Sequence, residues 1–308
     1  MPSRQEQVDF FRSHLEACNL CPRRCGVNRL EGETGFCRAG AGLKVASHCL
    51  HTGEEPPISG SRGSGTIFFS HCNMACVYCQ NFPISRLGHG NDVTVEDLAG
   101  MMLSLQARGA HNINLVTPAH YLTGTVESIF LARDRGLSIP VVYNSSGYES
   151  VETIEMLEGV VQVYLPDMRY STSESAARYS GTPDYPAHNR TAVRAMLDQV
   201  GHLETGHEEG DGTGGEIARR GLIIRHLVLP SLLSETRDIL EFIARELSPE
   251  TAVSLMFQYF PANPEGIPPE INRRITEEER TEAIRILSDC NLENGWVQEP
   301  DRPGGPVA

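Results

Sequence analysis

Short, almost continuous apolar runs alternate with longer amphipathic stretches along most of this chain. From residue 66 onward, an apolar run followed by a stretch of helical period repeats six times. A strand that is apolar at every position is typical of a parallel sheet covered on both faces, and the stretches between predict the helices that cover it. The predicted strands comprise residues 67–70, 112–116, 139–143, 160–165, 222–229 and 253–258.

The stretches between these strands carry helix signals. Thr94 stands three residues before Asp97, close to the pattern of a capping box, and Gly136 follows the next stretch as a helix-ending residue. Six β/α units rather than eight predict an α/β fold built as a partial (β/α)6 barrel, in which chemistry belongs at the carboxyl ends of the strands. The predicted helices comprise residues 8–17, 95–108, 125–135, 173–179, 187–200, 235–247 and 276–287, with one more short helix ending near residue 159.

Three segments depart from this alternation. Residues 48–65 are rich in glycine and proline and predict a loop that leads into the first barrel strand. Residues 201–220 are acidic, rich in glycine and without an apolar stripe, which predicts a mobile surface loop. Residues 299–308 predict a frayed end. We therefore expect a cysteine-rich N-terminal extension (residues 1–60), a core domain (residues 61–290) and a C-terminal tail (residues 291–308).

Composition narrows the class of protein. The 308 residues are 40% apolar and carry a formal net charge of −14, which disfavours nucleic acid as a partner. No apolar run reaches the roughly 18 residues that a membrane span requires, and the polar start has no signal-peptide core, so no membrane partner is expected. Nine cysteines in a chain that is not exported favour metal or cluster ligation over disulfides. These features predict a cytoplasmic protein.

Three of the cysteines follow the first predicted barrel strand. Cys72, Cys76 and Cys79 have the spacing C-x3-C-x2-C. A structural zinc site needs four protein ligands, whereas three thiolates on one loop can hold three irons of a [4Fe–4S] cluster and leave the fourth iron open. The alternatives are three reduced core cysteines and a zinc site completed by His71 or a distant ligand.

A second cysteine group precedes the barrel. Cys18, Cys21, Cys25 and Cys37 lie on a turn-rich segment that is too short to have its own core. Four thiols are what a closed four-cysteine site requires, and tetrahedral zinc and a second iron–sulfur cluster are both chemically reasonable. Four free thiols are the alternative. Cys49 lies outside this group and is expected to be a buried thiol.

The loop before the first barrel strand carries three side chains that can bind ligands. His51, Glu54 and Glu55 occur in the segment H-T-G-E-E-P, whose spacing is not that of a helical H-E-x-x-H zinc site. One interpretation is a solvated or hydrogen-bonded loop. The other is a position near the active site, since the loop lies shortly before Cys72.

The triple-cysteine segment resembles the signature of the radical S-adenosylmethionine (radical SAM) enzymes, C-x3-C-x-aromatic-C, with Tyr78 as the aromatic residue. The resemblance implies a radical SAM barrel, a [4Fe–4S] cluster on the three cysteines, and S-adenosylmethionine on the open iron. In that family, one electron cleaves the sulfonium to a 5'-deoxyadenosyl radical, which abstracts a hydrogen atom. An electron donor of the flavodoxin or ferredoxin type is then expected as a partner.

The resemblance also implies roles at the strand ends. This chain lacks the G-G-E-like motif that receives the methionine amino group in many members, so Thr117 or backbone carbonyls are expected there. Asn144 and Ser146 look like the asparagine-glycine turn of the pyruvate formate-lyase activating enzyme, and a plain turn is the alternative. The remaining candidates are Tyr78 for the adenine, Asp167 for the ribose, and Arg169 and Arg225 for the methionine carboxylate. A structural Asp–Arg ion pair is the alternative for the last group.

Three segments together resemble the radical SAM branch related to the pyruvate formate-lyase activating enzyme: C-P-R-R-C, H-T-G-E-E-P and C-N-M-A-C-V-Y-C-Q-N. The likeness extends over nearly the whole chain and implies activation of a glycyl-radical protein. True activators often carry extra ferredoxin-like clusters after the triple-cysteine loop, whereas here the additional cysteines precede it. A radical SAM enzyme acting on a small molecule, and a non-catalytic iron–sulfur or zinc protein, therefore stay open as alternatives.

Overall fold

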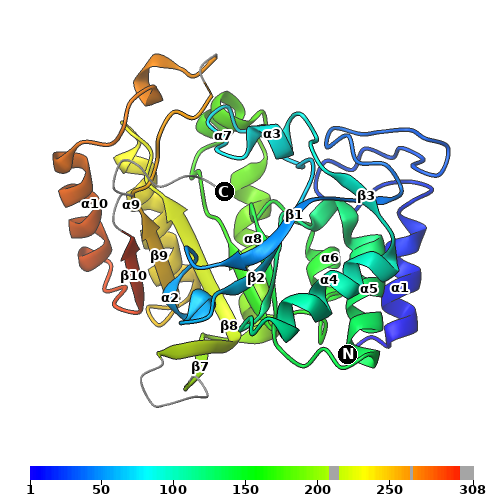
Figure 1. The fold of residues 1–308 in the computed structure, drawn as a ribbon. Coiled ribbons are helices and arrows are strands. Elements are labelled where there is room, and N and C mark those ends of the chain that lie inside the picture. The colour runs from blue at the N-terminus through cyan, green and yellow to red at the C-terminus, as the bar shows by residue number, and fades with distance from the viewer. Residues whose placement is uncertain (208–214, 264–265, 299–308) are drawn as a thin grey trace.

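The computed structural model of the protein describes residues 1–207, 215–263 and 266–298. Its strands form one ten-stranded sheet within these ranges. The parallel strands lie side by side in the order β10, β9, β8, β6, β5, β4 and β2, and antiparallel β1 and β3 extend the sheet beyond β2 (Figure 1). The sheet is not closed, since β10 and β3 form its two edges. The predicted α/β fold with a partial barrel is therefore confirmed.

The barrel strands are buried because helices cover them on the outside. Every side chain of β5, β6 and β9 is buried, as the continuous apolar runs predicted. The parallel strands are β2 (Ser64–Phe69), β4 (Ile113–Val116), β5 (Val141–Ser145), β6 (Val163–Pro166), β8 (Glu216–Leu227), β9 (Ala252–Met256) and β10 (Gly295–Gln298). The antiparallel strands are β1 (Leu43–His51), β3 (Asn91–Val93) and β7 (Glu204–His207).

The helices follow the strands in the predicted order. Thr94 and Asp97 form a complete capping box at the start of α4, which confirms that start. The α-helices are α1 (Arg4–Ser13), α2 (Pro56–Ser59), α3 (Phe82–Ser85), α4 (Val95–Ala107), α5 (Leu122–Asp134), α6 (Val151–Glu155), α7 (Ser173–Ser180), α8 (Tyr185–Val200), α9 (Leu233–Phe242) and α10 (Glu277–Asp289). Two 3-10 turns, η1 (Ala119–Tyr121) and η3 (Pro269–Ile271), and one π-helical turn, η2 (Ile243–Leu247), complete them.

The first helix begins earlier than its apolar pattern predicts. Ser3 and Glu6 form a capping box, so α1 starts at Arg4 and ends at Ser13 rather than covering residues 8–17. Phe11 of α1 is fully buried, and its backbone carbonyl accepts a hydrogen bond from the Thr123 hydroxyl of α5. The helix therefore packs on the outer layer of the barrel.

Two predicted loops are partly strands. Residues 48–51 belong to β1, which pairs antiparallel with β2, so the loop prediction for residues 48–65 is wrong at its start. Because β1 lies near the edge of the sheet, Cys49 is half-buried rather than buried as predicted.

The predicted mobile loop at 201–220 is also wrong where it is described, because β7 pairs antiparallel with the first part of β8. Residues 208–214 and the predicted frayed end at 299–308 lie outside the described residues. Gly221 lies where β8 ends its pairing with β7 and begins to pair with β6. Its φ is +119°, and a Cβ there would lie 2.3 Å from the His202 carbonyl oxygen.

Different helices, strands and loops lie at the two ends of the barrel. Figure 1 shows β7 at one end of the molecule, with α3, α7 and the N-terminal loops at the other. The carboxyl ends of the parallel strands lie at this second end, and β10 at the far edge is a strand that the sequence pattern did not predict. Among the described helices, none combines the length and apolar character needed to cross a membrane.

Candidate functional site

The triple-cysteine loop leaves the carboxyl end of β2 and lies over the barrel. Cys76 is buried, while Cys72 and Cys79 are half-buried. All three pack in one apolar cluster rich in tyrosine, which includes Tyr78 and Tyr259. The structure therefore brings the three predicted cluster ligands together at the strand ends.

Each of the three sulfurs lies within hydrogen-bond distance of a polar group. A guanidinium nitrogen of Arg169 lies 2.8 Å from Cys76 Sγ, and the Ser180 hydroxyl lies 2.9 Å from the same sulfur. Cys79 Sγ lies 3.2 Å from the Ser85 hydroxyl, and the backbone N–H of Met74 donates to Cys72 Sγ at 3.4 Å. Because a guanidinium can only donate, the sulfur of Cys76 is the acceptor of the bond from Arg169.

The three thiols are a donor set that fits a [4Fe–4S] cluster. Burial, with a smaller contribution from Cys76, raises the pKa of the Cys72 thiol to about 12, so deprotonation has to accompany metal binding. A cluster takes each thiolate on a different iron, and three thiols from one loop are the set that such a cluster needs.

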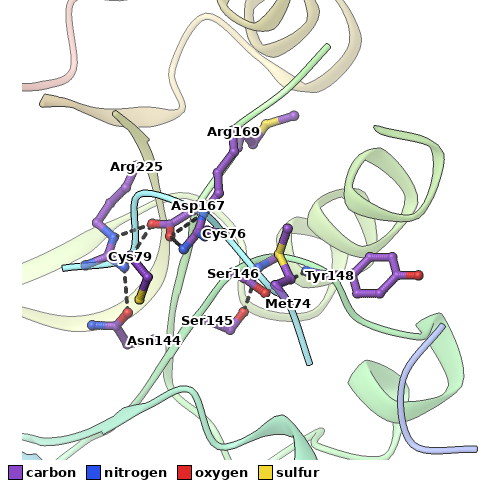
Figure 2. Close-up of polar contacts among 12 residues, drawn as sticks. Met74, Cys76, Cys79, Asn144, Ser145, Ser146, Tyr148, Asp167, Arg169 and Arg225 are labelled. Atoms are coloured by element: carbon purple, nitrogen blue, oxygen red, sulfur yellow. Dashed lines mark hydrogen bonds and ion pairs between the residues drawn. The ribbon is translucent and has the colours of Figure 1, made fainter. Parts of the chain in front are cut away.

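Asp167 lies between two arginines at the ends of β6 and β8. Arg225 donates to Asp167 Oδ1 at 2.9 Å and to Asn144 Oδ1 at 2.6 Å, as the dashed lines in Figure 2 show. Arg169 donates to Asp167 Oδ2 through Nε at 3.1 Å and through a second nitrogen. The backbones of Asp167 and Arg225 also form a parallel bridge. One network therefore connects three strand ends with the sulfur of Cys76.

The charge state of Asp167 follows from these neighbours. Burial opposes its ionisation, but the cations of Arg225 and Arg169 outweigh burial and hold the pKa of Asp167 below its ordinary value. The structural ion pair that the sequence left as an alternative is thus present in the structure. Asp167 has two oxygens with two lone pairs each, so it can still accept from a ligand hydroxyl.

The H-T-G-E-E-P loop lies inside this network. Glu54 accepts a hydrogen bond from Asn114 at 3.1 Å, and its other oxygen lies 3.6 Å from an Arg225 nitrogen. Glu55 is 1% exposed and accepts from Gln298 at 3.2 Å, while its Oε2 has no hydrogen-bond partner in the described residues. The interpretation that placed this loop near the strand ends is the one the structure supports. His51 lies apart from them on β1, against the ring of Phe68.

The turn after β5 is held tightly by residues that the sequence did not mark. Asn189 of α8 donates to the carbonyls of Gly147 and Asp167 at 3.1 and 2.9 Å. Gly147 has φ +70°, and a Cβ there would lie 2.2 Å from Asn189 Nδ2. The Tyr185 hydroxyl lies 2.9 Å from the carbonyl oxygens of both Ser146 and Asp167. Asn189 and Tyr185 sit on an amphipathic helix, where nothing in the local pattern distinguishes them from packing residues.

The remaining predicted cofactor contacts lie beside the network. The Thr117 backbone N–H donates to the Asn144 carbonyl at 2.8 Å, and Thr117 has a left-handed φ of +58°. The Tyr78 hydroxyl lies 2.6 Å from the Tyr170 hydroxyl, and its ring packs edge-on against Tyr259. Their roles toward S-adenosylmethionine stay predictions.

The N-terminal cysteines gather around one cavity. Cys18, Cys21, Cys25 and Cys37 all line it, together with Asn73 of the triple-cysteine loop. All nine cysteines of the chain are free of disulfides. The grouping supports the prediction that these four act together.

No family model matches the chain. The uncharacterized protein MJ0674 of Methanocaldococcus jannaschii is 32% identical to it over 298 residues, which cover 93% of this chain and 79% of that protein. The uncharacterized protein MJ0808 of the same organism is 25% identical over 158 residues, which cover 46% of each chain.

Solved structures share the fold at low sequence identity. SuiB of Streptococcus suis bound to its precursor peptide SuiA has a TM-score of 0.51 and 9% identity, over 74% of this chain and 47% of SuiB. SuiB bound to S-adenosylmethionine has a TM-score of 0.49 and 9% identity, over 74% of this chain and 45% of SuiB. A domain of pyruvate-formate lyase-activating enzyme from Bacteroides vulgatus has a TM-score of 0.37 and 13% identity, over 56% of this chain and 87% of that domain. The chain spans about half the length of SuiB.

Proposed function

We propose that this chain, which belongs to the family of the uncharacterized protein MJ0674, is a radical S-adenosylmethionine enzyme. One observation carries the proposal: the triple-cysteine loop after β2 meets the Asp167 network after β6 and β8 through the hydrogen bond from Arg169 to Cys76. The fold shared with SuiB supports it. The motif provides the chemistry, and the network provides polar side chains for a cofactor beside it.

Cys72, Cys76 and Cys79 are the proposed ligands of a [4Fe–4S] cluster. When bound, this cluster supplies the electron that cleaves S-adenosylmethionine to methionine and a 5'-deoxyadenosyl radical, which abstracts hydrogen from the substrate. The protein side of the site keeps the sulfurs in place through Arg169, Ser180 and Ser85. Burial among tyrosines keeps water away from a reactive species.

The strand ends are proposed to hold the cofactor itself. Asp167 accepts hydrogen bonds from the ribose hydroxyls, and either Arg169 or Arg225 turns toward the methionine carboxylate while the other keeps its pair with Asp167. Asn144 and Ser146 line the ribose from the turn after β5. Tyr78 faces the adenine through its backbone or ring, and Thr117 offers its side chain or carbonyl to the methionine amino group.

We propose hydrogen abstraction from a protein or peptide as the first substrate class. The branch resemblance implies a glycyl-radical protein, and SuiB, which shares the fold, was solved with a precursor peptide. A small molecule is the second candidate, and a non-catalytic iron–sulfur or zinc protein is the third. We further propose that the four N-terminal cysteines ligate a metal or cluster, and that a flavodoxin or ferredoxin of the cytoplasm donates the electrons.

Anaerobic reconstitution with iron and sulfide, followed by reduction, tests the enzyme proposal. The wild-type protein should convert S-adenosylmethionine to 5'-deoxyadenosine and methionine, measured by mass spectrometry. Cys79→Ala should reduce both products to background, whereas Cys290→Ser, at a cysteine far along the chain at the end of α10, should not. If Cys79→Ala kept the wild-type rate, the proposal would be wrong. No cleavage by a wild-type protein that carries the cluster would favour the non-catalytic alternative.

A further inference from the structure

We propose that Ser180 and Tyr170 are positioning residues for the reaction, and that they act through the sulfur of Cys76 to raise the reduction potential of the cluster on the triple-cysteine loop. The inference rests on the proposed function, because the cluster is the group on which these two residues act. Ser180 ends α7 and Tyr170 lies in the segment after β6. Their hydroxyls, together with that of Tyr78, form a hydrogen-bond chain that ends on Cys76.

The sulfur of Cys76 has shorter hydrogen bonds than the other two sulfurs of its loop. It accepts from a guanidinium nitrogen of Arg169 at 2.8 Å and from the hydroxyl of Ser180 at 2.9 Å. Among the described residues, the nearest hydrogen-bonding groups to the sulfurs of Cys72 and Cys79 lie at 3.4 and 3.2 Å. Cys76 is therefore the ligand on which the surrounding protein acts most strongly.

The hydroxyl of Ser180 is the last of three hydroxyls that follow one another. Its oxygen lies 2.7 Å from the Tyr170 hydroxyl, which lies 2.6 Å from the Tyr78 hydroxyl. A cysteine that ligates iron has no hydrogen to donate, so Ser180 donates to Cys76. Because a hydroxyl has only one hydrogen, Ser180 must then accept from Tyr170, and Tyr170 must accept from Tyr78. All three hydrogens are thus directed along the chain toward the sulfur.

The chain lies away from water. Cys76, Tyr78, Tyr170 and Ser180 are all buried. In such surroundings a hydrogen bond is electrostatically stronger than in water, and successive bonds of a chain polarise one another. Each hydroxyl therefore strengthens the bond that reaches the sulfur, and its effect should decline with its distance from Cys76 along the chain.

Backbone contacts fix the end of α7 beside the triple-cysteine loop. The N–H of Ala75 donates to the Ser180 carbonyl at 3.3 Å, and the N–H of Val77 donates to the preceding carbonyl of α7 at 2.9 Å. These two residues flank Cys76. The helix can end directly after Ser180 because Gly181 adopts a left-handed φ of +59°. The distance between the hydroxyl and the sulfur is therefore set by the backbone as well as by the side chains.

The effect on the cluster follows from its change of charge. Reduction adds one negative charge, and a hydrogen bond donated to a ligand sulfur stabilises that charge and raises the reduction potential. Ser180 and Tyr170 should therefore make the cluster easier to reduce. Arg169 acts on the same sulfur but also pairs with Asp167, so it should influence cofactor binding as well.

Potentiometric titration of the reconstituted protein, followed by electron paramagnetic resonance of the reduced cluster, tests the inference. The cluster of the triple-cysteine loop is identified as the signal that Cys79→Ala removes. Its midpoint potential should shift to lower values in Ser180→Ala, by less in Tyr170→Phe, and by least in Tyr78→Phe. The last variant keeps the ring that is proposed to face the adenine.

Tyr179→Phe is the matched control for the two tyrosine variants. The Tyr179 ring stacks on Tyr170, but its hydroxyl donates to Glu270 and not to the chain, so the potential should stay at the wild-type value. A second measurement separates Ser180 from Arg169. Arg169→Ala should lower both the potential and the affinity for S-adenosylmethionine, whereas Ser180→Ala should lower the potential alone.

Unchanged potentials in both Ser180→Ala and Tyr170→Phe would overturn the inference, and so would an equal shift in Tyr179→Phe. Tyr170→Phe keeps the Ser180 hydroxyl, so it tests the chain even if Ser180→Ala loses the cluster. If the shifts occur but the wild-type protein forms no 5'-deoxyadenosine, the inference stands and the proposed function fails. If 5'-deoxyadenosine forms without these shifts, the proposed function stands and the inference fails. A wild-type protein that assembles no [4Fe–4S] cluster would overturn both.

Discussion

The two cysteine groups are built in opposite ways. The triple-cysteine loop is anchored by a barrel strand and receives hydrogen bonds from Ser180 of α7 and from Arg169 after β6, so its geometry is set by elements far apart in the sequence. The N-terminal group lies on residues 18–42, a stretch of turns without helix or strand. A site with an open iron needs a rigid frame that leaves one position free, whereas a closed site of four thiolates can organise its own segment around the metal.

The largest effect should come from removing all metal. Binding energy at a structural four-ligand site is on the order of 10 kcal/mol and serves as folding energy. Apo protein should therefore lose amide protection over residues 18–42 while β4 and β5 stay protected. Hydrogen exchange read by mass spectrometry measures this difference. Equal protection of both regions before and after chelation would remove the distinction between them.

Arg225→Ala tests how much the ion pairs at the strand ends stabilise the barrel. The substitution leaves Asp167 and Glu54 without the cation they share, and breaking a buried pair costs about 3–5 kcal/mol. Denaturant unfolding should show a loss of that order. Arg285→Ala on the surface of α10 is the matched control, and it should cost less than about 1 kcal/mol because its pairs are exposed. Similar losses in both variants would show that the strand-end network does not stabilise the barrel.

Arg169→Ala tests whether the network around Asp167 also binds S-adenosylmethionine. A charge-assisted contact to the methionine carboxylate is worth roughly 1.5–3 kcal/mol, or about ten- to a hundredfold in affinity. Titration of S-adenosylmethionine into the reconstituted variant should show a weakening of that order, with an unchanged cluster absorption spectrum. Asp167→Asn should cost less, since an amide still accepts from a hydroxyl. Unchanged affinity in both Arg169→Ala and Arg225→Ala would place the cofactor elsewhere.

Arg23→Ala tests the contact between the N-terminal cysteine segment and the triple-cysteine loop, which Arg23 forms with Asn73. Arg23 makes hydrogen bonds to Asn73, Gly181 and Thr182, and its loss should cost about 1–3 kcal/mol in unfolding free energy. Its neighbour Arg24 makes an exposed ion pair with Glu152, so Arg24→Ala should cost about 0–1 kcal/mol. Chemical denaturation of the two reconstituted variants makes the comparison. A larger loss in Arg24→Ala would mean that this contact is formed by other residues.

Glu55 provides a test of another kind, a pH dependence of the stability of the barrel side. Burial, opposed by Arg225 and reinforced by Glu54, raises the pKa of Glu55 from 4.5 to about 7. Between about pH 4.5 and pH 7 the folded protein keeps a proton that the unfolded chain has released. This contribution to stability is therefore complete below pH 4.5 and declines as pH rises, by about 1 kcal/mol per pH unit.

Glu55→Gln should flatten that decline, because an amide does not titrate. Denaturant unfolding of wild type and variant at several pH values between 5 and 8 measures it. Other groups around Glu55 are Glu54, Arg225, Ser254 and Gln298, of which Glu54 is the one whose pKa is also raised by burial. A parallel pH dependence in variant and wild type would assign the decline to Glu54 or to another group.

The barrel was predictable because its strands are apolar on both faces. β5 and β6 show this signal clearly, and the barrel rule then places Asn144 and Asp167 at one end. β1 escaped prediction because an antiparallel strand near the edge needs no continuous apolar run, and its exposed Ser47 and His48 look like loop residues. β7 escaped because a short exposed hairpin strand buries little apolar surface.

The candidate site was predictable in its ligands and only partly in its contacts. Cysteine spacing identified Cys72, Cys76 and Cys79, because ligands that lie on one loop need a particular spacing in the sequence. Nothing local marks Ser180 as a donor to Cys76, or Arg23 as a partner of Asn73, since these contacts depend on how separate elements pack. Glu54 is an intermediate case. The sequence marked its segment as able to bind ligands, but its contact with Arg225 could not be predicted without the three-dimensional structure.

The hydrogen bond between Glu55 and Gln298 has a consequence for the order in which the molecule is assembled. The two residues are 243 positions apart, and Gln298 belongs to β10, the last strand of the described chain. Contacts of such long sequence separation form late, because the closing of so large a loop has to precede them. During synthesis, the surroundings of Glu55 in the H-T-G-E-E-P loop are complete only after β10 has left the ribosome. The two cysteine segments, within residues 18–79, therefore emerge from the ribosome well before the surroundings of Glu55 are complete.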